Sequence, residues 1–321
     1  MTRERTVRLI VGLFLFLLMF GPLLSNAIHL LVDWIWFGRE GFRVLYSTVL
    51  KAQIALSGFA GIGFMLILAI NLVIARRLTR HSGYRVYHEV IEFPALDRFR
   101  TAFRWVIWVG VLLVGYMVGN WASGHWLEYL LARHRVVMSE SDPLFGLNLG
   151  FYLFRLPFVW FLYHFALVTL ILCLLSAIFV YLVEGGVTVT PRGPIVSREA
   201  QAHLCVLGAL LFVVIAYRFR LAMYGLLYSP RGTLYGAGYS DVHASLPIFW
   251  ILLVLSVLAG AALVWAAAAR GIRAALWATG ALIAIGILGG SFYPEMVQRF
   301  VVAPNELDKE LPFIARTITL R

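Results

Sequence analysis

Long apolar runs separated by short polar segments are the main pattern in this sequence. A helix that crosses the hydrocarbon core of a bilayer needs about 20 residues, and seven runs approach or exceed that length. They are Leu9–Val32, Ala52–Ala75, Trp105–Ala122, Pro157–Val183, Ala202–Tyr217, Leu246–Ala269 and Ala274–Phe292, of which the fifth is the shortest. We therefore predict an all-α integral membrane protein with about seven transmembrane helices in residues 1–292 and no soluble domain.

Composition supports a membrane protein. Of the 321 residues 61% are hydrophobic and only 13% are charged, about half the charged share of a soluble domain. The net charge of +11 comes from residues at the ends of the apolar runs, where anionic lipid explains it and no nucleic-acid partner is needed. Only Lys51 and Lys309 are lysines among 27 basic residues, a bias typical of a GC-rich bacterial genome.

The distribution of basic residues predicts the orientation of the chain. Arginine and lysine are roughly twice as dense in alternate connecting segments, and the segment Arg76–Arg104 alone holds seven arginines. Because basic segments stay in the cytoplasm, we expect a cytoplasmic N-terminus and an extracytoplasmic C-terminus in a bacterial plasma membrane. Aromatic residues near Trp34 and Trp121 then mark outer boundaries, and the stretch His125–His134 has the spacing of an interfacial helix.

Small residues predict close helix contacts. Gly115 and Gly119 form a GxxxG pattern within the third run, which allows two helix backbones to approach in lipid. The pattern fits ordinary packing inside the helical bundle, and it also fits a surface for oligomer formation. The cysteines Cys173 and Cys205 lie inside apolar runs and are read as small core residues.

Few ionisable residues lie at membrane depth. His29 and Asp33 share one face of the first helix with Asn26, and His164 lies in the fourth run. Such groups are functional candidates because a buried charge is costly. The pair fits a proton relay or cation site, and equally a polar anchor at the wet end of the helix. A lone histidine such as His164 is commonly satisfied by a carbonyl of a neighbouring helix.

Catalytic and cofactor motifs are missing from the sequence. It has no HExxH zinc motif, no GxSxG nucleophile pattern with its partners, no phosphate-binding loop and no CxxCH haem site. Asp241 and His243 could supply two metal ligands, but no neighbour in sequence completes a set. We therefore expect no cofactor or metal, and an enzymatic role is not favoured.

The polar segments expected outside the membrane resemble those of a known family. They include "DWIWFGREGFRVLYSTVL", "SDPLFGLNLGFYLFRLPF", "SPRGTLYGAGYSDVHASLP" and "YPEMVQRFVVAPNELDKELPFI", which in this order resemble the UPF0182 family of large bacterial and archaeal membrane proteins. The resemblance implies about seven spans followed by a large extracytoplasmic region, with residues 293–321 as a stalk-like start of that region. Two differences from the family pattern are Asn148 in place of an aspartate and Phe313 in place of a tyrosine.

Three hypotheses for the function follow. The first is a non-catalytic anchor or scaffold for extracytoplasmic protein, with membrane lipids and other membrane or extracytoplasmic proteins as partners. The second is a transporter or channel for a lipid or small solute, lined by His29, Asp33 and His164. The third is a membrane-embedded enzyme that uses Asp142, Asp241, His243 and Glu306.

The candidate residues of an outer interaction surface are Asp142, Tyr235, Tyr239, Asp241, His243, Asn305, Glu306 and Glu310. The glycine- and tyrosine-rich loop that holds Tyr235 and Tyr239 is read as a lid on the helix ends, or as a surface that holds a partner or lipid.

Overall fold

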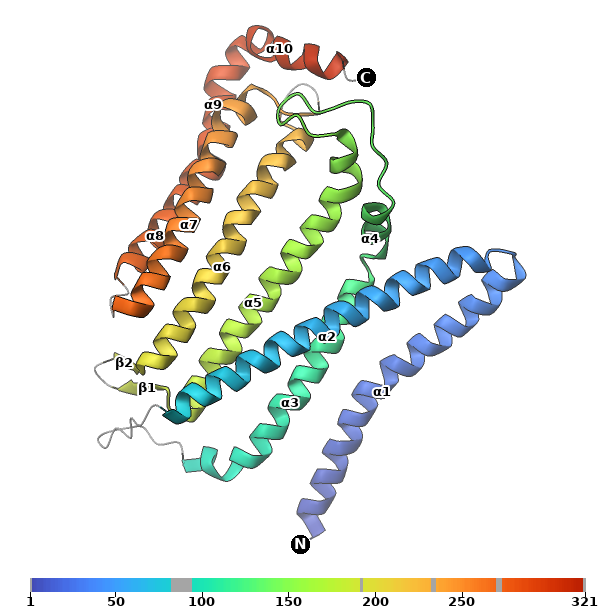
Figure 1. Ribbon diagram of the computed structural model, residues 1–321, viewed down its shortest axis with the longest axis vertical. Coiled ribbons are helices and arrows are strands. Elements are labelled where there is room, and N and C mark those ends of the chain that lie inside the picture. Colours follow the sequence, from blue (N-terminus) through green and yellow to red (C-terminus); the bar gives the residue numbers. More distant parts are fainter. Residues whose placement is uncertain (1, 82–93, 191–192, 232–234, 270–272, 320–321) are drawn as a thin grey trace. The chain divides into compact units, whose positions relative to one another are not determined.

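The computed structural model describes residues 2–81, 94–190, 193–231, 235–269 and 273–319 (Figure 1). Helices dominate the described residues, as predicted, and one short antiparallel β-hairpin was not predicted. The longer helices are α1 (Thr2–Arg39), α2 (Arg43–His81), α3 (Pro94–Ser123), α5 (Leu156–Glu184), α6 (Arg198–Gly225), α7 (Leu246–Ala269), α8 (Arg273–Ile287) and α10 (Glu306–Thr319). The shorter elements are α4 (Trp126–Arg133), β1 (Val187–Thr190), β2 (Gly193–Val196) and α9 (Tyr293–Val297).

The predicted apolar runs all form helices. Six helical stretches among the described residues are long and apolar enough to cross a membrane: Arg43–Thr79, Trp105–Ser123, Phe151–Glu184, Arg198–Tyr228, Asp241–Ala268 and Leu276–Ala315. The first predicted run lies within α1. The chain is therefore a helical membrane protein, as its composition indicated.

The stretch Arg198–Tyr228 is longer than the apolar run Ala202–Tyr217 that it contains. We predicted an end at Tyr217, but the helical stretch continues past Arg218 and Arg220 to Tyr228. The guanidinium of Arg220 lies 4.9 Å from the ring centroid of Tyr224 and 5.4 Å from that of Trp250. Aromatic faces attract a cation in this position, so an arginine is accommodated near the helix end.

The chain forms two compact units. The first contains residues 1–65 and 103–130. Within it α1 and α2 form a helical hairpin in which Phe37 stacks on Tyr46 at 4.9 Å between ring centroids, and the Tyr46 hydroxyl donates a hydrogen bond to the carbonyl of Leu30. The aromatic residues predicted at this boundary therefore join the two helices.

The GxxxG pattern is used for packing inside the first unit. A Cβ atom placed on Gly119 would lie 2.9 Å from the backbone oxygen of Ser57, and one on Gly61 would lie 3.0 Å from that of Gly115. Backbones of α2 and α3 thus touch where glycine leaves space. Of the two readings of this pattern, packing within the bundle is the one that the structure supports.

This contact gives a testable prediction. Gly119→Ala is expected to lower the free energy of unfolding by about 1 to 3 kcal/mol, because the new methyl group must push against backbone atoms. Gly58→Ala is the control, since nothing lies within 4 Å of a Cβ atom there. Denaturant titrations in mild detergent would compare both variants with the parent, and equal stability of the two would contradict the packing assignment.

The second unit contains residues 66–102 and 131–321. In it α6 packs between α5 and α7, and α8 packs on α7 (Figure 1). The core between α6, α7 and α8 includes Phe212, Leu252, Ala259 and Leu282. Cys173 and Cys205 are buried and free, as predicted. Gly185 ends α5 in a left-handed conformation, with φ of 82°, which glycine adopts at little cost.

The last part of α2 is held to α5 by polar contacts. The side-chain amide of Asn71 donates a hydrogen bond to the carbonyl of Cys173 at 2.9 Å. One turn further, Arg76 lies 3.3 Å from the carboxylate of Glu184. Both contacts are within the second unit. Residues 82–93 of the arginine-rich segment Arg76–Arg104 lie outside the described residues.

Four widened helical turns share one sequence signal. Each is a five-residue π-helical turn that ends two residues before a proline: Phe151–Arg155 before Pro157, Asp241–Ser245 before Pro247, Leu288–Phe292 before Pro294 and Gln298–Val302 before Pro304. The amide of the residue preceding each proline bonds to a carbonyl five residues back, as Leu156 does to Phe151. Proline lacks an N–H and its ring clashes with the carbonyl four residues back, so a wider turn relieves the strain.

These turns correct our expectation for Pro157. We placed this proline at the start of a span, whereas the helical stretch begins earlier, at Phe151. The π turn allows the helix to continue through the proline. The same reasoning applies at Pro247, where the stretch begins at Asp241 and not at Leu246.

Candidate functional site

One end of the second unit is covered by three segments that we call the cap: residues 134–150, residues 229–231 with 235–245, and residues 306–315. They lie next to the first turn of α5, the last turn of α6 and the first turn of α7. These segments belong to three regions predicted to lie on one side of the membrane, and the structure brings them together at one end of the bundle.

The first cap segment is organised around Asp142, which is only 2% exposed. Its carboxylate accepts hydrogen bonds from the backbone amides of Leu144 at 2.7 Å and Phe145 at 2.8 Å. The hydroxyl of Tyr152, from the π turn before α5, donates a third at 2.9 Å. Since several donors satisfy the buried charge, Asp142 fixes the loop to the start of α5.

Asn148 closes the same loop. Its side-chain oxygen accepts hydrogen bonds from the amides of Met138 and Gly150, both at 3.0 Å. Its side-chain NH₂ donates to the carbonyl of Met138 at 2.6 Å. An aspartate, the residue expected from the family pattern, has no donor for that carbonyl. The asparagine therefore has a structural role for which charge is not required.

The second cap segment is organised around Asp241, which is 1% exposed. Its carboxylate lies 3.4 Å from the guanidinium of Arg231 and accepts a hydrogen bond from the hydroxyl of Ser245. Arg231 also donates to that hydroxyl at 3.0 Å. In addition, Ser240 donates to the side-chain oxygen of Gln298 at 2.6 Å. These contacts hold the loop to the first turn of α7 and to the last span.

Helix α10 is attached to the second cap segment by Glu310, which is 3% exposed. One carboxylate oxygen accepts a hydrogen bond from the amide of Tyr239 at 3.2 Å. A Cβ atom on Gly238 would lie 3.0 Å from the other oxygen, so glycine leaves the space that the carboxylate occupies. The amino group of Lys309 lies 5.0 Å from the ring centroid of Tyr239, which adds a cation–π contact.

Aromatic rings complete this attachment. Tyr239 and His243 stack with their ring centroids 4.2 Å apart, and Phe313 of α10 meets both rings edge-on. Residues 293–319, which we expected to form a stalk-like extension, are thus helical, and α10 turns away from the direction of α8 (Figure 1). Of the two readings of the tyrosine-rich loop, these contacts fit a compact lid.

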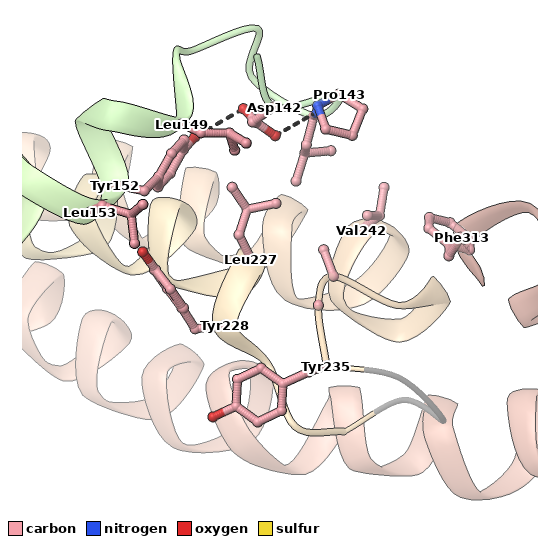
Figure 2. Close-up of a pocket in the computed structure, with 13 residues that line it drawn as sticks. Asp142, Pro143, Leu149, Tyr152, Leu153, Leu227, Tyr228, Tyr235, Val242 and Phe313 are labelled. Atoms are coloured by element: carbon pink, nitrogen blue, oxygen red, sulfur yellow. Dashed lines mark hydrogen bonds between the residues drawn. The ribbon is translucent and has the colours of Figure 1, made fainter. Parts of the chain in front are cut away.

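A cavity of about 310 Å³ lies beneath the cap (Figure 2). Figure 2 shows Asp142 and Pro143 on one side of it and Tyr228 and Tyr235 on the other. Most of the wall is aliphatic or aromatic. The lining residues are Asp142, Pro143, Leu144, Leu149, Tyr152, Leu153, Leu227, Tyr228, Tyr235, Gly236, Ala237, Val242 and Phe313.

The structure distributes the predicted candidates unevenly. Asp142, Tyr235, Tyr239, Asp241, His243 and Glu310 all belong to the cap. Asn305 and Glu306 are exposed at the start of α10. Among the described residues, no group of three His, Cys, Asp or Glu side chains could hold a metal ion. Asp241 contacts Arg231, and the Nδ1 atom of His243 lies 3.1 Å from the carbonyl of Tyr239.

The candidates at membrane depth lie elsewhere. His29 and Asp33 are exposed on α1 in the first unit, and the side chain of Asn26 lies outside the described residues. His164 is exposed on α5 in the second unit. Its ring packs on Trp160 at 5.7 Å and on Tyr163 at 5.0 Å between centroids. Aromatic neighbours on its own helix therefore accommodate this histidine.

Sequence reasoning missed several residues of the site. Tyr152 lies in an apolar stretch and resembles an ordinary membrane-facing residue, yet its hydroxyl bonds Asp142. Arg231 lies ten residues before Asp241, a separation that matches no helical or strand period. The proline two residues beyond each π turn is the one local signal that would have pointed to this end of α5 and α7.

Known proteins similar to this chain match it over part of their own length. A UPF0182 protein of Pelobacter propionicus is 37% identical over 301 residues, which are 93% of this chain and 34% of the relative. A UPF0182 protein of Desulforamulus reducens is 32% identical over 93% of this chain and 34% of its own length. One from Trichlorobacter lovleyi is 32% identical over 99% of this chain and 35% of the relative.

The chain thus spans about a third of the length of these relatives. No solved structure matches it. A family model described as an uncharacterised protein family, UPF0182, matches residues 8–321. The resemblance that we saw in the polar segments therefore extends over almost the whole chain, which belongs to the UPF0182 family.

Proposed function

We propose that this chain is a non-catalytic membrane module whose cap anchors and positions extracytoplasmic protein at a bacterial plasma membrane. The observation that carries the proposal is the state of Asp142, Asp241 and Glu310. All three carboxylates are buried and bonded to groups of the same unit. A general acid or base must reach a substrate, whereas carboxylates used in this way stabilise a preformed surface.

The exposed side of α10 supports a docking role. Leu307 and Leu311 lie four residues apart and are exposed, while Glu310 and Phe313 face the second cap segment. One face of α10 therefore packs against the second cap segment, and another face exposes apolar side chains. Relatives about three times as long as the chain supply the kind of additional protein that such a surface could hold.

A photo-crosslinking experiment tests the proposal. A photoreactive amino acid at Leu307, which is 76% exposed, is expected to crosslink the protein, as the cell makes it, to a peptide outside residues 1–321 or to a second protein. The same probe at Trp277, exposed on α8, is expected to yield only lipid adducts. Lipid adducts alone from Leu307 would rule out the anchoring role.

The same position tests the proposed orientation. A cysteine at Leu307 is expected to react with a membrane-impermeant maleimide added to intact spheroplasts, because positive-inside bias places α10 outside the cytoplasm. The natural thiols Cys173 and Cys205 are buried and give a low background. Labelling only after the membrane is broken would reverse the assigned topology.

A further inference from the structure

The cavity under the cap lies where three membrane-spanning stretches end. Tyr152 and Leu153 are within two residues of the start of Phe151–Glu184, Leu227 is one residue from the end of Arg198–Tyr228, and Val242 follows the start of Asp241–Ala268. The cavity therefore lies at one end of three helical stretches that are long and apolar enough to cross a membrane. In a bilayer, lipid chains surround such helices at far higher concentration than any soluble ligand.

Two polar side chains of the cavity wall, Asp142 and Tyr152, are bonded to each other and to the loop. The carboxylate of Asp142 accepts two backbone amides and the hydroxyl of Tyr152. The carboxylate therefore has little remaining capacity for an ionic partner. The hydroxyl of Tyr152 already uses its hydrogen in the bond to this carboxylate. The other lining groups are largely aliphatic or aromatic. A ligand that fits this wall is apolar, because an apolar ligand leaves no polar group unpaired.

The size and rim of the cavity limit further which apolar ligands can bind there. Its volume of about 310 Å³ is roughly ten times the volume of about 30 Å³ that one water molecule occupies in the liquid. Tyr228 and Tyr235 are exposed, Tyr235 by 70%. Tyrosines at a membrane boundary place the ring in the apolar layer and the hydroxyl toward headgroups. An extended hydrocarbon chain with a polar end suits this arrangement.

We propose that the cavity under the cap binds one acyl chain of a membrane lipid, with Phe313 of α10 closing one part of the wall. The site goes beyond the anchoring role, because it concerns lipid and lies under the cap, away from the exposed face of α10. Lipid bound there fills the space between the first two cap segments and the helix ends, and so supports the cap from below.

The test uses the full chain in bilayers that contain a phospholipid with a diazirine near the end of one acyl chain. After illumination, we expect adducts on the peptides 142–153 and 227–242. Ala237→Phe places a ring in the cavity wall and should reduce these adducts about tenfold, a difference of about 1.4 kcal/mol. Ala261→Phe, the same change at an exposed position on α7, should leave them unchanged.

Two results would overturn the proposal. One is equal labelling of both peptides in Ala237→Phe and Ala261→Phe, and the other is labelling confined to the membrane-facing surfaces of the helices. Thermal unfolding of Ala237→Phe in detergent at the same temperature as the parent shows that the cap is folded, so loss of lipid labelling cannot be ascribed to unfolding. Because lipid labelling and protein crosslinking are read separately, either proposal can fail without the other.

Discussion

Asp142→Ala is expected to lower the free energy of unfolding of the second unit by about 3 kcal/mol. The change removes the acceptor for two backbone amides and the hydroxyl of Tyr152, and each buried donor left unpaired costs about 1 to 3 kcal/mol. We take a value below the full sum because a partly opened loop can expose some of these donors to water. Denaturant titration in mild detergent measures the loss.

A matched variant distinguishes the contribution of the backbone amides to Asp142 from that of the Tyr152 hydroxyl. Tyr152→Phe leaves the carboxylate with both amide donors and is expected to cost about 1 kcal/mol, typical of one hydrogen bond. The double variant should cost less than the sum of the two single changes, because both remove the same bond. A cost for Asp142→Ala no larger than that for Tyr152→Phe would show that the carboxylate does not organise the loop.

Arg231→Ala is expected to have the second largest effect, lowering the free energy of unfolding by about 2 kcal/mol. Removing one partner of a buried ion pair leaves an uncompensated charge, which costs about 3 to 5 kcal/mol when both partners are buried. Here Asp241 is buried but the side chain of Arg231 is about one-third exposed, so solvent reduces the loss. Thermal unfolding in detergent, followed by the exposure of the loop to protease, reports both stability and local opening.

The rescue variant makes this prediction specific. Arg231→Ala combined with Asp241→Asn removes the charge together with its partner. The amide of Gly238 and the hydroxyl of Ser245 both donate to the Asp241 carboxylate; an asparagine oxygen can still accept from Gly238, and its NH₂ group can donate to the Ser245 oxygen. We expect this double variant to be more stable than Arg231→Ala alone. Without such recovery, the arginine would contribute through packing of its aliphatic part and not through its charge.

Much of the fold was predictable because lipid imposes a simple requirement on the chain. A spanning segment must be apolar and must satisfy its own backbone, so the runs that begin near Ala52, Ala202 and Leu246 could be recognised from sequence. Their ends were harder to predict. We placed the start of one span at Pro157 and the end of another at Tyr217, but a π turn and two aromatic rings allow the helices to extend beyond these residues.

Several residues of the cap could be named from sequence, but their partners and their arrangement could not. We expected Asp142, Asp241 and Glu310 to lie on an exposed interaction surface on one side of the membrane, but all three side chains are buried. Their partners explain the difference. Glu310 bonds an amide 71 residues earlier, and Tyr152 lies in an apolar stretch. Neither pair of residues could be predicted from its spacing in the sequence, because both pairs depend on how the helices pack.

The attachment of α10 through Gly238 also determines where chimaeric proteins can be joined. The carboxylate of Glu310 lies where a side chain on residue 238 would crowd it, 3.0 Å from a Cβ atom placed on Gly238, and Phe313 fits against the rings of Tyr239 and His243. The loop before α7 and helix α10 are therefore inherited as a pair. An exchange between relatives with its junction between α7 and α8 separates that pair, whereas a junction before Ser229 transfers both from one parent.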